Sequence, residues 1–377
     1  MKKKFTCPYC YEAHDLKTCG LKCSYNVPGK KDVRCYTDVE KDERGFIPNK
    51  YKKPCMRCKE AKKTFYCPKA NKEIPAEFLE TTTKVNIALV GAKTVGKSNY
   101  IGVLVNEIQK KMTGPFRCIF NKRINEESAQ CYDEYYYNIL YRYHNVVPFY
   151  HNDLRIPMIF PLRFLDRRNW IKNTAMLTFY DEAGGNFDDQ DDVLITNRYL
   201  PNANGIILLL DPLQVPAIRG KLKDRVRLPG RSTEMVDVLE NLTRILREKQ
   251  NIKPNQKINT PLAIAFTKTD LLYNNKEIFA KTETLGEDSP HLARGVFVDS
   301  DLEAVDREIR DLLEGWIDAE LQQYLNNFSS YAFFGVSALG CEPMGSKLPD
   351  EGVKPKRVLD PLLWLLAEKK VIKRVKK

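Results

Sequence analysis

The sequence has no long apolar run, so we expect no membrane-spanning helix. Its apolar stretches are short, such as Ile206–Leu210, whereas a helix needs about 20 apolar residues to cross a bilayer. No apolar stretch follows the basic residues at the N-terminus, so we also expect no secretory signal. Of the 377 residues, 43% are hydrophobic and 29% are charged, and the mean hydropathy is −0.46. This composition predicts one or two folded domains of a cytoplasmic protein.

Histidine is scarce, with 4 residues, and the 11 cysteines are unevenly placed. Eight of the cysteines precede residue 70, several of them in C-x-x-C pairs. In a chain without an expected export signal, this pattern favours metal binding in a reducing compartment over disulfide bonds. The sequence therefore predicts a cysteine-rich module over residues 1–78, followed by a junction and a second domain.

The cysteine spacing favours structural zinc, which takes four ligands in a tetrahedron. The first four cysteines supply one complete set: Cys7, Cys10, Cys19 and Cys23. A second set contains Cys55, Cys58 and Cys67, with Cys35 as the candidate fourth ligand, because Ala70 stands where another C-x-x-C would end. A crossed arrangement, in which the first pair shares an ion with the third, stays open. We expect His14 to lie at the surface, since the cysteines already suffice.

The net charge of +12 is concentrated in the cysteine-rich module. Residues 1–80 contain 19 Lys and Arg against 11 Asp and Glu, a balance of +8. A basic bias suggests nucleic acid or another anionic partner. Charge balance around anionic cysteine–zinc centres explains it equally well, so both interpretations stay open.

One stretch, Gly91–Ser98, reads G-A-K-T-V-G-K-S and fits the phosphate-binding P-loop. An apolar strand is predicted before it, Val85–Val90, and an amphipathic helix after it, Asn99–Met112. In that context the loop N–H groups and the helix N-terminus face a phosphate. Lys97 would reach the β- and γ-phosphates, and the Ser98 hydroxyl would bind Mg²⁺. The predicted phosphate-binding residues are Gly91, Ala92, Lys93, Thr94, Val95, Gly96, Lys97 and Ser98.

A second motif, D-x-x-G, follows the predicted strand Ala175–Tyr180 as Asp181-Glu182-Ala183-Gly184. The Asp181 carboxylate would hold Mg²⁺, directly or through water. The Gly184 N–H would meet the γ-phosphate, so residues 185–192 would form a mobile acidic switch.

Two further motifs would read the base. Thr267-Lys268-Thr269-Asp270 follows the predicted strand Pro261–Phe266 and is close to N-K-x-D. Asp270 can accept two hydrogen bonds from guanine that adenine cannot donate, and the Lys268 stem would cover the base. Ser337-Ala338-Leu339 follows the predicted strand Tyr331–Val336 and fits the S-A-x element beneath the base.

The remaining pattern predicts an α/β fold with a six-stranded, mostly parallel sheet. The other two strands are expected at Met158–Leu165 and Gly205–Asp211, and a loop is expected over residues 212–231. Helices are expected at Asn125–Tyr143, Ser232–Lys249, Leu302–Asn326 and Val358–Glu368. The first of these is rich in tyrosine and should pack on the sheet, while the Lys-rich tail should be solvated.

The four motifs occur in the order found in Ras-like P-loop GTPases of the TRAFAC class, which residues 84–370 resemble. The whole chain more loosely resembles bacterial GTPases that carry an N-terminal zinc ribbon and are associated with double-GTPase conflict or signalling systems. The resemblance implies GTP or GDP, Mg²⁺ and Zn²⁺ as ligands, and protein partners that read the switch state, with a second GTPase as one candidate. It implies Lys97, Asp181 and Gly184 as catalytic residues.

Two departures from the family pattern concern hydrolysis. No threonine lies in the segment 144–157, where the switch threonine is expected, and Gly185 stands where a water-positioning Gln often follows D-x-x-G. GTP hydrolysis would then be intrinsic, activated by a partner, or absent. The alternatives to a switch GTPase are a nucleotide-binding scaffold without turnover and a nucleic-acid-binding zinc-ribbon protein regulated by GTP.

Overall fold

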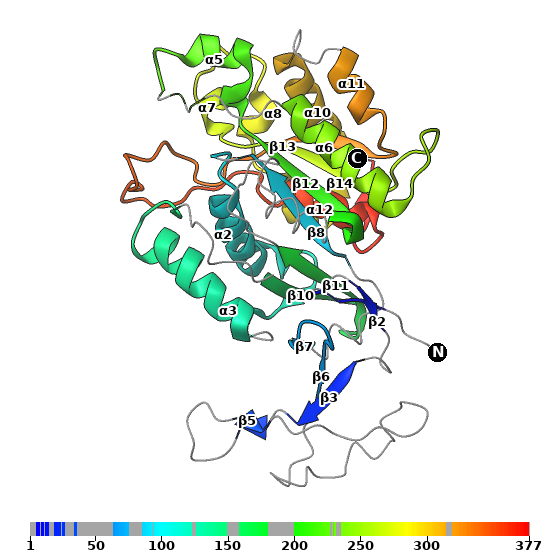
Figure 1. The fold of residues 1–377 in the computed structure, drawn as a ribbon. Helices are drawn as coiled ribbons and strands as arrows, with labels where there is room; N and C mark the ends of the chain where they lie inside the picture. Colours follow the sequence, from blue (N-terminus) through cyan, green and yellow to red (C-terminus); the bar gives the residue numbers. More distant parts are fainter. Residues whose placement is uncertain are drawn as a thin grey trace. The chain divides into compact units, whose positions relative to one another are not determined.

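The chain divides into two compact units, Met1–Thr82 and Thr83–Lys377 (Figure 1), called here the N-terminal and the C-terminal unit. The structure is a computed structural model. It describes residues 5–7, 9–10, 12–14, 19–23, 25–26, 34–35, 63–74, 85–92, 94–122, 126–148, 158–179, 200–226, 228, 230, 235–313 and 319–376.

The N-terminal unit consists of short antiparallel strands in three small sheets. These are β1 (Phe5–Thr6) with β2 (Ala13–His14), β3 (Gly20–Cys23) with β6 (Lys63–Tyr66) and β7 (Glu73–Ile74), and β4 (Tyr25–Asn26) with β5 (Arg34–Cys35). Strands this short bury little apolar surface. Its buried described side chains are three cysteines, one tyrosine, one isoleucine and one histidine: Cys7, Cys19, Cys67, Tyr66, Ile74 and His14. The interior of this unit is therefore rich in cysteine.

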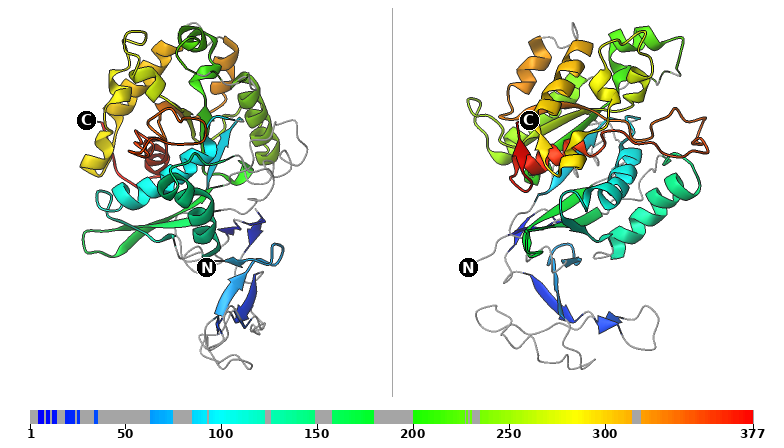
Figure 2. Two further views of the ribbon diagram at one scale, coloured as in Figure 1. Left: turned by 90° about the vertical axis from the view of Figure 1, so that its left-hand side faces the viewer. Right: turned by 180° about the vertical axis from the view of Figure 1, so that it is seen from behind.

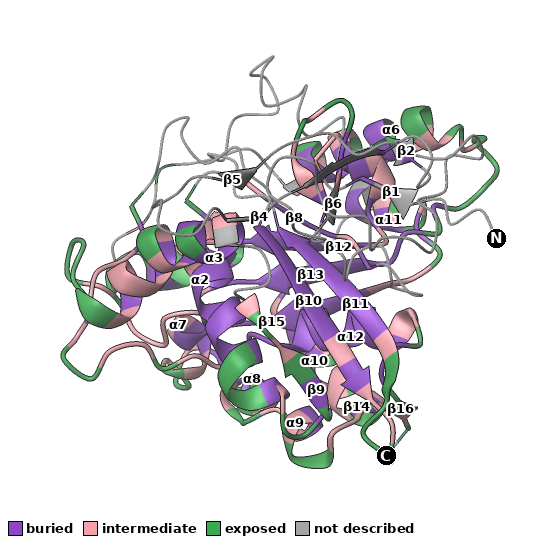
Figure 3. Ribbon diagram, turned by 90° about the horizontal axis from the view of Figure 1, so that it is seen from below, coloured by how far each residue is buried: buried purple, intermediate pink, exposed green. Residues whose placement is uncertain are grey.

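The C-terminal unit is built on a four-stranded parallel sheet in the order β15-β13-β12-β8. The strands are β8 (Ile87–Gly91), β12 (Gly205–Leu210), β13 (Leu262–Phe266) and β15 (Tyr331–Gly335). They are almost wholly buried (Figure 3), as continuous apolar strands covered on both faces should be. Because the strands are parallel, their carboxyl ends meet at one edge, where ligands bind in open α/β sheets.

A second, antiparallel sheet has the order β11-β10-β9. It contains β11 (Ile171–Phe179), β10 (Met158–Leu165) and the unexpected strand β9 (Cys118–Phe120). β10 and β11 pair antiparallel because a short turn joins them, whereas parallel strands need a long crossover. All six predicted strands exist, but the single six-stranded sheet is not confirmed. β11 packs beside β8, yet no hydrogen-bonded ladder links the described residues of the two strands.

Helices cover the parallel sheet. α2 packs against β8, α12 against β12 and β13, and α10 against β15. The helices are α2 (Lys97–Glu107), α3 (Glu126–Tyr132), α5 (Pro216–Leu222), α6 (Met235–Gln250), α7 (Asp270–Tyr273), α8 (Glu283–Gly286), α9 (Pro290–Arg294), α10 (Asp299–Leu312), α11 (Ala319–Leu325) and α12 (Asp360–Glu368). α2 continues as the π-helix η1 (Ile108–Met112) and α3 as the π-helix η3 (Asp133–Arg142). Within the described ranges, no helix has the length and apolar content needed to cross a lipid bilayer.

The tyrosine-rich helix runs beside α2, as Figure 2 shows from two sides. Tyr132 and Tyr136 are buried in the core that α2 shares with the sheets. The Tyr132 hydroxyl donates a hydrogen bond of 2.8 Å to the carbonyl of Gly102. The expectation that these tyrosines pack inward is confirmed for this pair, while Tyr143 is exposed.

One expectation for the C-terminal unit was wrong, and two were met only in part. Part of the expected loop 212–231 is helical, as the 3₁₀-helix η5 (Pro212–Gln214) and α5, because proline suits the first position of a helix. The expected helix over Leu302–Asn326 is described as α10 and α11, and residues 314–318 lie outside the described ranges. The side chains of Lys370, Lys373 and Lys376 in the basic tail are exposed, as expected, but the tail is also structured. It forms β16 (Arg374–Val375), which pairs in parallel with β14 (Phe297–Val298), and Arg374 forms ion pairs with Asp299 and Glu368.

Candidate functional site

The P-loop lies between the end of β8 and the start of α2. Its backbone takes left-handed conformations at Thr94, with φ 68°, and at Gly96, with φ 89°. No atom lies within 4 Å of the position that a Gly96 Cβ would take, so a side chain is excluded here by conformation, not by contact. Gly91 is different, because a Cβ there would lie 2.8 Å from Val95. Lys97 and Ser98 form the first turn of α2, at the positive end of the helix dipole.

Asp270 and Ser337 lie at the carboxyl ends of β13 and β15. The Ser337 hydroxyl donates a hydrogen bond of 2.6 Å to Oδ1 of Asp270, and Ser337 Oγ accepts one of 3.0 Å from the N–H of Gly340. Both Asp270 and Ser337 are buried. Burial raises the pKa of Asp270, and the Ser337 hydrogen bond opposes that rise. The carboxylate is thus held in a fixed direction, with a second oxygen available to a ligand.

Lys268 links the end of β13 to the P-loop. Its Nζ atom donates to the carbonyl of Thr94 at 3.2 Å and to Oδ2 of Asp211 at 2.5 Å. The Asp211 side chain is fully buried and also accepts a hydrogen bond of 2.9 Å from the N–H of Leu213. Asp211 was not among the predicted site residues. The available signal was that an acidic residue ends the apolar strand β12.

Thr267 directs its hydroxyl into the protein scaffold. Its Oγ1 donates a hydrogen bond of 3.1 Å to the carbonyl of Leu210, which also accepts the backbone N–H of Thr267 at 2.8 Å. The side chain is buried. Thr267 therefore ties β13 to β12 at the edge of the site.

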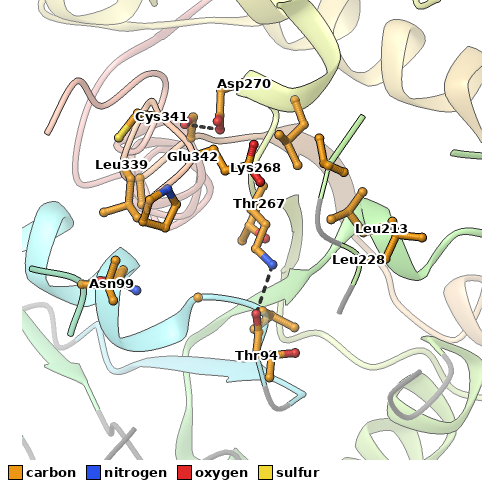
Figure 4. A pocket seen from close by; sticks show the side chains of 18 of the residues that line it. Thr94, Asn99, Leu213, Leu228, Thr267, Lys268, Asp270, Leu339, Cys341 and Glu342 are labelled. Carbon is orange, nitrogen blue, oxygen red and sulfur yellow. Dashed lines mark hydrogen bonds between the residues drawn. The ribbon is translucent and has the colours of Figure 1, made fainter. Parts of the chain in front are cut away.

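A cavity of about 400 Å³ joins these elements (Figure 4). This volume is within the range of small-molecule sites. The cavity brings together the P-loop, the segment after β13 and the segment after β15. Its lining includes Thr94, Val95, Gly96, Asn99, Leu213, Leu228, Thr267, Lys268, Asp270, Ser337, Ala338, Leu339, Cys341 and Glu342. The predicted base-reading and phosphate-binding residues thus share one cavity.

The start of the predicted switch segment is attached to the P-loop helix. The N–H of Val147 donates to Oδ1 of Asn99 at 2.9 Å, and the N–H of Val146 donates to the carbonyl of Ser346 at 2.8 Å. Asn99 directly follows Ser98. The segment 144–148 therefore connects the P-loop helix to the loop that follows Ser337-Ala338-Leu339.

A buried ion network supports the loop after β15. Arg357 donates to both Asp301 oxygens, at 2.8 and 3.0 Å, and to Asp360 at 2.9 Å. Next to it, Lys356 and Ser337 exchange two backbone hydrogen bonds, at 2.9 and 3.0 Å. His291, Asp301 and Asp360 could together hold a metal ion, but the Arg357 guanidinium already binds both carboxylates. This network therefore anchors the loop after β15.

Several predicted residues lie outside the described ranges. They are Lys93, Asp181, Gly184, Cys55 and Cys58.

The N-terminal unit brings Cys7, Cys10 and Cys67 together with His14. The expectation that His14 lies at the surface was wrong, because this residue is 6% exposed. It is buried because the pairing of β1 with β2 turns the chain back toward Cys7 and Cys10. Cys19 is buried but is not part of this described group, and Cys23 and Cys35 end the strands β3 and β5.

Comparisons with known proteins give remote likenesses. No protein-family model matches the sequence. A protein of Mycolicibacterium smegmatis, provisionally named ESX-1 scaffolding and assembly protein SaeC, is 26% identical over 317 residues, which cover 79% of this chain and 78% of that protein.

Among solved structures, the GTPase-like domain of Ski7 from S. cerevisiae, bound to GTP, has a TM-score of 0.35 and 14% identity, over 76% of this chain and 50% of that chain. The small GTPase Arl6 (BBS3) from Trypanosoma brucei, with bound GppNp, has a TM-score of 0.32 and 12% identity, over 77% of this chain and all of that chain. The chemistry of the site follows from its own residues, not from these remote likenesses.

Proposed function

We propose that this protein is a Mg²⁺-dependent GTP-binding protein that works as a molecular switch. One observation carries the proposal. Three motifs that are distant in sequence line a single cavity, and Lys268 joins two of them through the carbonyl of Thr94. A strand–loop–helix element that can hold phosphates therefore lies next to a fixed carboxylate that can select a base.

Asp270 would select guanine. One of its oxygens is held by Ser337, so the carboxylate presents acceptors in one direction toward the ring N–H and the exocyclic amine of guanine. Adenine offers no such pair of donors, and a buried acceptor without a partner is costly. The Lys268 stem and Leu339 supply apolar surface for the two faces of the base.

The residues that would hold Mg²⁺ fit that ion, because Ser98 offers a hydroxyl oxygen and Asp181 a carboxylate, the hard ligands that Mg²⁺ prefers. The ion would neutralise charge on the β- and γ-phosphates when bound. Lys97 would bind the same phosphate oxygens, and the Gly184 N–H would contact the γ-phosphate. The start of α2 adds partial positive charge to this cluster.

Switching would work through the segment 144–148. Asn99 accepts a hydrogen bond from Val147, so a change at the P-loop helix reaches this segment directly. We infer that the γ-phosphate orders the residues that follow it and the loop after Asp181, and that a partner reads the difference.

A nucleotide-binding scaffold without turnover is the second candidate. The absence of a threonine from residues 144–157 and the presence of Gly185 after D-x-x-G favour it. The provisional name of the Mycolicibacterium smegmatis relative, a scaffolding and assembly protein, agrees with this candidate.

The N-terminal unit would bind Zn²⁺ and recruit the partner, which is a protein such as a second GTPase. Its cysteines suit the cytoplasm, where thiols stay reduced. Nucleic acid is the alternative partner, because residues 1–80 have a charge balance of +8.

Competitive binding of GTP, GDP, ATP and xanthosine triphosphate with Mg²⁺ tests the proposal. In Asp270→Asn, the affinity for guanine nucleotides should fall about ten- to a hundredfold, since hydrogen bonds to a charged group are lost. The affinity for xanthosine triphosphate should rise, because the Asn amide can donate to the carbonyl that replaces the guanine amine. The exposed Asp237→Asn is the matched control. Equal binding of ATP and GTP by the native chain contradicts the assignment.

Multiple-turnover phosphate release separates the two candidates. Turnover that persists in the exposed control Lys249→Ala and is lost in Lys97→Ala supports a GTPase. Tight GTP binding without turnover, with or without a partner, supports the scaffold.

A further inference from the structure

Four side chains of the N-terminal unit form a compact set of possible metal ligands. One ligand atom from each of Cys7, Cys10, His14 and Cys67 lies within 4.8 Å of all the others. The sulfur atoms of Cys67 and Cys10 are 3.4 Å apart. The His14 Nε2 atom lies 3.0 Å from the sulfur of Cys10 and 3.7 Å from that of Cys67. Cys7, His14 and Cys67 are buried.

The distances suit a tetrahedral zinc ion. Zinc–sulfur bonds of about 2.3 Å and zinc–nitrogen bonds of about 2.0–2.1 Å place tetrahedral ligand atoms roughly 3.5–3.8 Å apart. The Cys67–His14 distance of 3.7 Å falls in this range, the Cys67–Cys10 distance of 3.4 Å is slightly shorter, and the Cys10–His14 distance of 3.0 Å is shorter by about 0.5 Å. Three thiolates with one imidazole are also a ligand set that selects zinc over the harder divalent cations.

Two similar turns present the sulfur atoms. In Cys7-Pro8-Tyr9-Cys10, the N–H of Tyr9 donates to the Cys7 sulfur at 3.4 Å. In Cys67-Pro68-Lys69-Ala70, the N–H of Ala70 donates to the Cys67 sulfur at 3.3 Å. Such donors stabilise thiolate charge beside a metal ion. The second turn has Ala70 where the first has Cys10, so it supplies one ligand instead of two.

His14 fills the place of the missing ligand. It lies on β2 opposite Phe5 of β1, and this pairing returns the chain to the turn that contains Cys7 and Cys10. The alternative set of the first four cysteines is disfavoured, because Cys19 directly precedes β3 and Cys23 is the last residue of that strand. Residues at the two ends of such a strand are separated by about 10 Å or more at 3.3 Å per residue, too far for one ion.

We propose that Cys7, Cys10, His14 and Cys67 form a three-thiolate, one-imidazole zinc site. The inference rests on the zinc-binding role proposed for the N-terminal unit and names its ligands. The ion would cross-link the β1–β2 hairpin to the end of β6, some 50 residues further along the chain. In a unit with so little apolar core, that cross-link would supply much of the folding free energy.

Cobalt substitution of the full-length protein tests the ligand set. Co²⁺ titrations with chelator competition give the affinity, and the visible absorption bands report the number of thiolates. His14→Ala should weaken one site by about tenfold or more, since a four-ligand site loses one ligand. His14→Cys should restore affinity and shift the bands toward a four-thiolate spectrum. His144→Asn, in the C-terminal unit, is the control and should change neither property.

A second-site rescue gives the sharper result. Residue 70 has the position in the second turn that Cys10 has in the first. Adding Ala70→Cys to the His14→Ala variant should therefore restore its affinity for Co²⁺. Co²⁺ could bind, with neither substitution at His14 altering the affinity or the spectrum, while Cys19→Ser alters them. In that case the proposed ligand set is wrong, but zinc binding by the N-terminal unit stands. If the purified chain binds no Co²⁺ or Zn²⁺, both fail. Guanine-nucleotide binding is measured separately and is independent of either outcome.

Discussion

Lys268 and Asp211 form an ion pair of 2.5 Å between the ends of two neighbouring parallel strands. The same Lys268 ammonium donates to the carbonyl of Thr94, so the pair fixes the P-loop relative to the segment after β13. The Asp211 carboxylate is fully buried, whereas Lys268 is about one-third exposed. Removal of the lysine leaves a buried carboxylate without a cation.

We therefore expect Lys268→Ala to lower both stability and nucleotide affinity. A buried charge that loses its partner is strongly destabilising, and the partial exposure of Lys268 reduces the expected loss to about 1–3 kcal/mol. Urea unfolding of the nucleotide-free protein measures it. The exposed pair of Lys281 and Asp311 provides the control, and Lys281→Ala should change stability by less than about 1 kcal/mol. Equal effects of the two substitutions would contradict the structural role of Lys268.

Thr267 should contribute to stability more than to nucleotide binding. Its hydroxyl donates to the Leu210 carbonyl, which keeps the backbone hydrogen bond from Thr267 when the hydroxyl is absent. Thr267→Val should therefore lower the free energy of unfolding by about 1 kcal/mol, the usual value of one hydrogen bond. Affinity for GDP, measured by fluorescence titration, should change little. A large loss of affinity without a loss of stability would identify Thr267 as a direct ligand contact.

The elements that define the fold were predictable because their signals are local. Each strand of the parallel sheet is a mostly apolar run, and β8, β13 and β15 end at a recognisable motif or within two residues of one. β9 was missed because Cys118–Phe120 is only three residues long and shows no periodic pattern. Prolines at 212 and 216 were interpreted as loop signals, although each stands at the first position of a helix.

The missed site residues depend on pairings between distant segments. Asp211 meets Lys268 only because β12 and β13 are neighbours, and Asn99 meets Val147 only after η3 ends. His14 joins Cys67 across more than 50 residues. Residue types and local spacing do not encode such contacts, so the sequence predicted that the three motifs share one site but not these particular pairings.

His291 should make stability depend on pH. It is buried, and its Nδ1 atom accepts a hydrogen bond of 3.1 Å from the N–H of Val298. It lies near Asp301, Asp360 and Arg357. Burial lowers its pKa below the ordinary value. The unfolded chain then binds a proton near pH 6.5 that the folded chain does not, so stability should fall as the pH drops below about 6.5.

The comparison with His291→Asn isolates this effect. Burial raises the pKa values of Asp270 and Asp360. The folded chain therefore takes up their protons before the unfolded chain does, so these two groups raise the stability as the pH falls, opposite to His291. Unfolding free energies between about pH 7.5 and 5.5 should fall less in His291→Asn than in the native chain. Identical slopes for the two proteins would show that His291 is not the titrating group.

Gly102 should be intolerant of even a methyl group, because η3 packs closely against α2 there. A Cβ at Gly102 would lie 2.6 Å from Leu140 Cδ1 and 3.2 Å from Tyr136 Cβ. Gly102→Ala gains helix propensity of about 0.5–1 kcal/mol, but overpacking of a filled core costs about 1–3 kcal/mol, so a net loss of stability is expected.

Gly114→Ala is the matched control, since nothing lies within 4 Å of its Cβ position, and its stability should stay within about 0.5 kcal/mol of that of the native chain. Because α2 also carries Lys97 and Ser98, GTP affinity should fall in Gly102→Ala and not in Gly114→Ala. Equal stability and affinity of the two variants would mean that η3 can move away from α2 without disturbing the P-loop.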